Sequence, residues 1–179
     1  MSRFRVLAAT FGVLVAIVAP AGASTDGNGN RGISSRAALE RSIVSEINAL
    51  RTSRGLRPLV ISKSLASVAR SHSRHMARVG YFAHVTPSGV DFAQRVRRHY
   101  RTAGFRSWRA GENLLWASPD VEAGRAVELW LESPSHRRVL LAPAWREIGL
   151  SAVHTAAAPR VFAGLEVTIV TADFGARLK

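Results

Sequence analysis

Three side chains of the kinds that bind metal ions or transfer protons stand in short segments with loop or helix-start composition: His84, Glu112 and His136. His84 lies within residues 81–87, which read as a loop, and loops carry a large share of functional residues. Glu112 stands between a glycine, which permits unusual backbone conformations, and an asparagine, whose amide can bridge backbone groups. His136 follows a Ser-Pro pair typical of a helix start, where the positive end of the helix dipole disfavours a protonated imidazole.

These three residues suit two kinds of chemistry. Two histidines and one carboxylate can hold Zn²⁺ or another divalent cation and leave one position open for water. Glu112 would then be the catalytic base of a metal-assisted hydrolase. The same trio could instead form only a hydrogen-bond network, in which Glu112 fixes the histidine tautomers. The residue types by themselves favour neither.

The other histidines are expected to be structural or solvated. His72 lies on the apolar stripe of a predicted helix, which favours a satisfied core residue over a ligand. His75 and His99 are expected to face solvent, and His154 to end a strand beside a turn.

The composition excludes several other chemistries. The chain has no cysteine, which rules out a disulfide framework, a cysteine-ligated zinc or iron–sulfur site and a thiol nucleophile. Its 25 Lys+Arg residues against 12 Asp+Glu give a formal net charge of +13. That excess favours attraction to anionic lipid or cell-wall polymers, although the codon bias of a GC-rich genome would give the same count. Aromatic residues are not interleaved with the arginines, so no specific nucleic-acid partner is expected.

The amino terminus has the three parts of a secretory signal peptide. Arg3 and Arg5 make it basic, residues 6–18 are almost wholly apolar, and residues 21–23 read Ala-Gly-Ala. The apolar run, about 13 residues, is too short to span a bilayer. We therefore expect a signal peptide over 1–23, a flexible lead-in over 24–36 and one domain over 37–179. The protein should be secreted or periplasmic, bacterial, monomeric and not membrane-spanning.

Hydrophobic spacing predicts helices first and strands afterwards. A helix over 37–53 has one apolar face, and Ser34 or Ser35 could cap it. A second helix begins after a Ser62 cap and is closed by Gly80. Three more helices are expected: one over 90–100, one that starts at Ser118-Pro119 and one that starts at Pro134. Residues 148–153 and 161–174 have the composition of strands. Helices packed on such strands predict an α+β domain.

Several motifs in order resemble the CAP (SCP-like) superfamily, which includes cysteine-rich secretory proteins, antigen 5 and plant pathogenesis-related proteins. The chain reads Phe-Ala-His at 82–84, Gly-Glu-Asn-Leu at 111–114 and Trp-x-x-Ser-Pro-Ser-His-Arg at 130–137. The helix spacing over 47–76 and the ending over 170–175 also fit. The resemblance covers about residues 43–175 and is closest to the short exported bacterial branch.

The resemblance implies a three-layer α–β–α sandwich with a small, mainly antiparallel sheet. It also implies a cleft with two histidines and two glutamates that can bind a divalent ion, of which His84 and Glu112 carry over. The eukaryotic Gly-His-Tyr-Thr-Gln motif is absent, and the family's second glutamate falls at Glu132 or at no residue. His136 is then the residue of its segment expected to face the cleft. The family's disulfides have no counterpart.

Three functions remain open from the sequence. The first is an exported binding domain for a lipid, a cell-envelope component or a divalent ion. The second is a metal-assisted hydrolase of peptide or cell-wall bonds, and the third is a secreted interaction or defence factor without a small ligand. Fold resemblance cannot decide among them.

Overall fold

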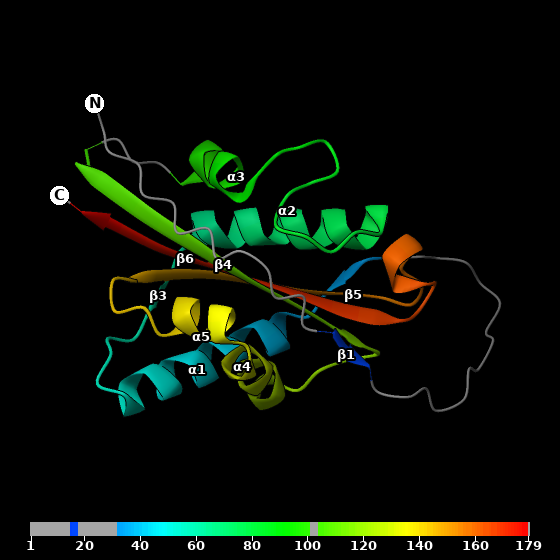
Figure 1. Ribbon diagram of the computed structural model, residues 1–179, viewed down its shortest axis with the longest axis horizontal. Coiled ribbons are helices and arrows are strands. Elements are labelled where there is room, and N and C mark those ends of the chain that lie inside the picture. The colour runs from blue at the N-terminus through cyan, green and yellow to red at the C-terminus, as the bar shows by residue number, and fades with distance from the viewer. Residues whose placement is uncertain (1–14, 18–31, 101–103, 179) are drawn as a thin grey trace.

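The computed structural model describes residues 15–17, 32–100 and 104–178, which form three layers (Figure 1). Helices α2 (Lys63–Val79) and α3 (Phe92–His99) cover one face of a β-sheet. Helices α1 (Ala37–Ser53), α4 (Ala123–Glu132) and α5 (Pro134–Leu140) cover the other face. The predicted α+β class and the α–β–α sandwich are thereby confirmed.

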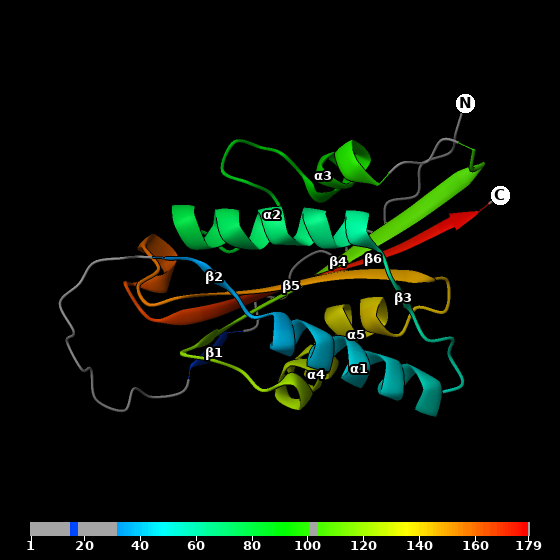
Figure 2. The same ribbon diagram turned by 180° about the vertical axis from the view of Figure 1, so that it is seen from behind.

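The centre of the sheet consists of three long antiparallel strands. Strand β6 (Val167–Leu178) lies between β4 (Ser107–Ser118) and β5 (Glu147–Thr155). Short strands pair with the two outer strands. Strand β2 (Ser34–Ser35) is antiparallel to β5, and β3 (Val60–Ile61) is parallel to β5. Strand β1 (Val15–Ile17) is parallel to β4. Figure 2 shows β2 and β3 along β5, with α1 and α2 on either side. The sheet is therefore mainly antiparallel, as expected.

Most of the predicted amino-terminal features lie outside the described residues. Of the expected signal peptide over 1–23 the structure describes only β1, and of the expected lead-in over 24–36 only residues 32–36. Within the described ranges, no helix combines the length and the apolar character needed to cross a membrane. Cleavage and export remain predictions.

Helices α1 and α2 have the predicted bounds because their apolar spacing and end signals agree with their packing. Ile43 and Ile47 of α1 are fully buried. The Ser62 hydroxyl accepts a hydrogen bond from the Leu65 amide at the start of α2. Gly80 ends α2 in the left-handed conformation, with φ of 79°.

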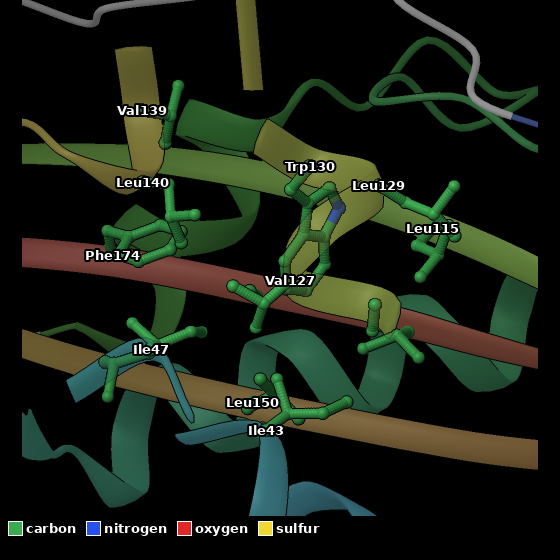
Figure 3. Packing of buried hydrophobic residues seen from close by; sticks show 14 of the residues in the cluster. Ile43, Ile47, Leu115, Val127, Leu129, Trp130, Val139, Leu140, Leu150 and Phe174 are labelled. Atoms are coloured by element: carbon green, nitrogen blue, oxygen red, sulfur yellow. The ribbon is translucent and has the colours of Figure 1, made fainter. Parts of the chain in front are cut away.

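The largest apolar cluster lies between the sheet and helices α1, α4 and α5 (Figure 3). Trp130 of α4 is at its centre, fully buried among Ile43, Val127 and Leu115 of the same cluster. The indole nitrogen of Trp130 donates to the Leu114 carbonyl oxygen at 3.0 Å. The indole ring is packed among apolar side chains and its N–H is hydrogen-bonded, and together these contacts hold α4 against β4.

The structure corrects four local predictions. Ser34 and Ser35 belong to β2, and Arg36 precedes α1 without a side-chain cap. The segment around Glu112 belongs to β4, whose residues are buried on both faces and so show no alternation. Ser118 ends that strand and donates to the Glu166 carbonyl, so α4 begins only at Ala123. The last strand begins at Val167, because Arg160–Phe162 form a 3₁₀ turn.

Candidate functional site

The site is built around Glu112, near the middle of β4. Successive side chains of a strand point to opposite faces. Leu114 packs with Met76 of α2, so Glu112 points to the same α2 face. Asn113 points the other way and donates to the carbonyl oxygen of His136 in α5 at 3.0 Å. The Glu112 carboxylate is thus placed beneath α2 and α3, with its side chain only 2% exposed.

Arg95 of α3 neutralises this buried carboxylate. One terminal nitrogen, Nη2, donates to both carboxylate oxygens of Glu112, at 2.9 and 2.7 Å. The other, Nη1, donates to the carbonyl oxygens of His84 at 2.6 Å and Val90 at 3.4 Å. A capping box at Asp91 begins the helix and sets its direction. Arg95 therefore holds Glu112 and both ends of the 84–90 loop together.

His84 makes the third contact to the carboxylate. Its Nδ1 lies 2.7 Å from Glu112 Oε1. Burial raises the pKa of Glu112, but the hydrogen bond from His84 and the positive charges nearby outweigh it and hold that pKa below its ordinary value. Because an ionised carboxylate only accepts, Nδ1 of His84 must carry the proton. The predicted pairing of these two residues is present in the structure.

His72 fixes the loop from the α2 side. Its Nε2 donates to the Ala83 carbonyl oxygen at 3.0 Å, and its Nδ1 lies 3.4 Å from the Tyr81 hydroxyl. The Tyr81 hydroxyl also lies 2.8 Å from Nδ1 of His75. Burial, chiefly, lowers the pKa of His72 to about 4, so its imidazole is neutral at pH 7. The expectation of a satisfied core histidine is confirmed, and His75 proves to be a partner of Tyr81.

A second buried carboxyl group lies directly across from Glu112. Asp173 of β6 is the register partner of Glu112 and is fully buried. No N–H or hydroxyl donor among the described residues reaches its carboxyl oxygens, and their contact is a hydrogen bond with the Glu112 carboxylate, which Asp173 can donate only when it is protonated. Burial, and then the negative charge of Glu112, raise the pKa of Asp173 well above its ordinary value. Asp173 is therefore held in its neutral form beside an ionised Glu112.

His136 and Glu132 do not join this group. His136 belongs to α5 on the opposite layer and is buried. Its Nδ1 has no hydrogen-bond partner among the described residues, and no hydrogen bond there joins its ring to His84 or Glu112. Burial and then the charge of His84 lower its pKa, so the two imidazoles sense each other only electrostatically. Glu132 is about half exposed and pairs with Arg125 at 2.8 Å.

The arrangement around Glu112 does not fit a divalent ion. Both carboxylate oxygens accept hydrogen bonds from Arg95, and one also faces Nδ1 of His84. A guanidinium has no lone pair to offer a metal, and its charge repels one. Among the described residues, no three His, Cys, Asp or Glu side chains form a group that could hold a metal. Zn²⁺ binding by His84, Glu112 and His136 remains a prediction without support from this geometry.

Two members of the site were missed from the sequence. The arginine content of the sequence does not single out Arg95, although its spacing from Phe92 and Val96 places it on the buried face of its helix. Asp173 is the one acidic residue in a strand composed mostly of apolar residues and threonine, which is a usable signal for a buried carboxyl group.

A basic hollow lies beside the site, between α2, residues 86–90 and α3. Its volume is about 220 Å³. Arginine, histidine and hydroxyl side chains dominate its lining: His72, His75, Arg95, Arg98 and His99, with Ser71, Thr86 and Ser88. No carboxylate is among the lining residues. The hollow thus presents donors and positive charge without a competing acid.

Comparisons with known proteins agree on the family. Residues 44–173 match the sequence pattern of the CAP family, the cysteine-rich secretory protein family. The uncharacterized protein YkwD of Bacillus subtilis (strain 168) is 32% identical over 140 residues, which are 76% of this chain and 51% of YkwD. The uncharacterized membrane protein YlbC of the same organism is 32% identical over 111 residues, 62% of this chain and 30% of YlbC. The chain thus spans about half or less of these relatives.

Solved structures show the same fold. An outer surface protein from Borrelia burgdorferi superposes with a TM-score of 0.63 at 23% identity, covering 82% of this chain and 98% of its own. An extracellular SCP-domain protein from Bacillus anthracis gives 0.59 at 26% identity, covering 80% of this chain and 41% of its own. Motifs, fold and sequence match therefore lead to one conclusion: the chain, although it has no cysteine, belongs to the CAP family of cysteine-rich secretory proteins.

Proposed function

We propose that this protein is an exported CAP-domain binding protein that holds an anionic group of a cell-envelope component in the basic hollow. The lining of the hollow carries the proposal: arginine, histidine and hydroxyl donors with no carboxylate. The nearest buried acid, Glu112, is already neutralised by Arg95. An anion entering the hollow would therefore meet the charge of Arg98, unpaired among the described residues, together with histidine and hydroxyl side chains, beside the two apolar residues Val68 and Val90.

The charge in the hollow comes from arginine at neutral pH. Burial is the main cause that lowers the pKa of both His72 and His75, so these imidazoles are neutral there and act as hydrogen-bonding groups. Arg98 is exposed at the last turn of α3, where a cation also interacts favourably with the helix dipole. Guanidinium groups suit phosphate and carboxylate because their N–H groups match the geometry of these anions.

The size of the hollow limits the ligand. At about 220 Å³ it is smaller than the roughly 300–1,000 Å³ of sites that enclose a drug-sized molecule. It therefore suits a single phosphate or carboxylate group that belongs to a larger molecule outside. Phospholipid headgroups and anionic wall polymers both present such a group.

Export is supported by two independent observations. The first 23 residues have the composition of a signal peptide. The similar solved structures are described as an extracellular protein and as an outer surface protein. Loss of those 23 residues would change the formal charge from +13 to +11, so the exported protein would still be attracted to anionic surfaces.

Binding of the mature protein to phosphatidylglycerol vesicles, to phosphatidylcholine vesicles and to inorganic phosphate tests the proposal. Arg98→Met should weaken binding to phosphatidylglycerol and to phosphate about tenfold, the effect of losing one charged hydrogen bond. Arg138→Met is the matched control, because Arg138 is an exposed arginine of α5 on the opposite layer. Equal weakening by both changes would show attraction by net charge alone and refute the hollow as the site. Mass spectrometry of the secreted fraction tests export, and an intact Met1 there would contradict cleavage.

A further inference from the structure

The cation beside Glu112 is supplied by the chain itself. We propose that Arg95 takes the place of a divalent ion in this cleft, so that Glu112 serves as the partner of an internal ion pair and not as a metal ligand. This goes beyond the proposed binding function, because it assigns the charge of the site to a residue and not to a cofactor.

The first argument is the occupancy of the carboxylate. A carboxylate has about four lone-pair positions. Three N–H···O contacts already use them, two from Arg95 Nη2 and one from His84 Nδ1, at 2.7–2.9 Å. The Glu112 side chain is 2% exposed and that of Arg95 is 9% exposed. The hydrogen bond with Asp173 takes the fourth position. A metal ion could therefore reach Glu112 only by displacing a donor, of which Arg95 and Asp173 are buried and His84 is 32% exposed.

The second argument is that Arg95 cannot move aside without opening the loop. Its Nη1 donates to the carbonyl oxygens of His84 and Val90, which lie at the two ends of residues 84–90. Its guanidinium also lies 5.8 Å from the ring centre of Phe92 on the same helix. Displacing the guanidinium would therefore break the loop contacts as well as the ion pair.

The third argument concerns the two remaining candidate ligands. His84 uses Nδ1 for Glu112, so a metal on its other ring nitrogen, Nε2, would have Glu112 behind it as a hydrogen-bond partner and not as a ligand. His136 belongs to α5 on the other layer, and its backbone oxygen is bonded to Asn113. Asp173, the carboxyl group nearest in register, is fully buried and hydrogen-bonded to Glu112 itself. No second carboxylate among the described residues is therefore free to share a metal ion with Glu112.

Zn²⁺ titration by calorimetry tests the assignment on four proteins: wild type, Glu112→Gln, Arg95→Met and the double variant. Wild type and Glu112→Gln should bind Zn²⁺ with the same affinity, because any uptake by surface histidines does not involve Glu112. Arg95→Met exposes the carboxylate to a cation and should bind Zn²⁺ at least tenfold more tightly than wild type, and the double variant should lose that gain. A tenfold weaker affinity of Glu112→Gln than wild type, or no gain in a folded Arg95→Met protein, would overturn the proposal.

A measurement on the unmodified protein decides the matter if the variants do not fold. The guanidinium protons of Arg95 should give protected side-chain signals in ¹H–¹⁵N spectra, because they are buried and hydrogen-bonded. These signals should stay in place when one equivalent of Zn²⁺ is added. Their shift or loss at that ratio would show that a metal displaces Arg95 and would overturn the assignment.

Discussion

The ion pair of Arg95 and Glu112 offers a quantitative test of the structure through stability. Both side chains are almost completely buried, so removing one charge leaves the other without a counter-ion in a region that water does not reach. Breaking a buried pair in this way costs about 3–5 kcal/mol of unfolding free energy. We therefore expect Arg95→Met and Glu112→Gln each to lose about that amount.

The double variant separates this cause from a loss of packing. With both charges removed, neither residue leaves an uncompensated ion, and replacement of a buried pair by neutral groups is often close to neutral. Arg95→Met/Glu112→Gln should therefore be at least as stable as either single variant, which corresponds to a coupling of at least about 3 kcal/mol. Two additive single effects would mean that the charges do not interact.

Urea denaturation at pH 7, followed by tryptophan fluorescence, measures these differences, since Trp130 is fully buried in the native state. In a chain of this size about 3–5 kcal/mol also corresponds to a fall in Tm of roughly 6–20 °C. Arg125→Met is the control: Arg125 pairs with Glu128 and Glu132 on the exposed face of α4, and its loss should leave the midpoint unchanged. Single variants of Arg95 or Glu112 within about 0.5 kcal/mol of wild type would refute the reasoning.

Three other predictions follow from burial. Ile47→Ala should cost about 2–5 kcal/mol in the same assay, because Ile47 is fully buried between α1 and the sheet; a cost below about 0.5 kcal/mol would contradict that packing. Gly149→Ala should lower the unfolding free energy by about 3 kcal/mol, because the new Cβ would lie 2.0 Å from the Ala66 amide nitrogen of α2. Gly124→Ala is the control, because a Cβ at Gly124 meets open space and should not destabilise the protein. Above the ordinary Asp pKa near 3.9, the unfolded chain releases the Asp173 proton while the folded chain retains it, so stability falls by about 1.4 kcal/mol per pH unit until the raised folded pKa is reached. Urea melts at several pH values should show no such fall in stability for Asp173→Asn. The variant should be more stable than wild type at pH 7 and similar to it near pH 3. A variant less stable than wild type at pH 7 would contradict a raised pKa of Asp173.

Helices with one apolar face could be predicted from the sequence with their bounds. In α1 and α2 the apolar residues recur at the helical period, and a serine cap and a left-handed glycine bound α2. Pro134 likewise gave the start of α5. These signals are local, because they depend on residues three or four positions apart and on the end groups of one helix. The fold class followed from them and from the resemblance.

Strand β4 could not be predicted in the same way. It is buried on both faces over most of its length, so its sequence has no alternation of polar and apolar residues, and the polar residues near its middle are Glu112 and Asn113. Which of these two side chains faces α2 depends on the register with β6, which pairs Glu112 with Asp173. A shift of one residue would exchange the two faces.

The composition of the site was decided by tertiary structure. His84 and Glu112 could be singled out by residue type, but their contact at 2.7 Å joins residues 28 positions apart. Arg95 was one arginine among many until α3 packed over the strand and buried its guanidinium against Glu112. His136 had the residue type of a ligand, yet α5 lies on the other layer. Residue types along the chain indicate which groups can react or bind, whereas charge neutralisation requires groups distant in sequence to be brought within hydrogen-bond distance and away from water.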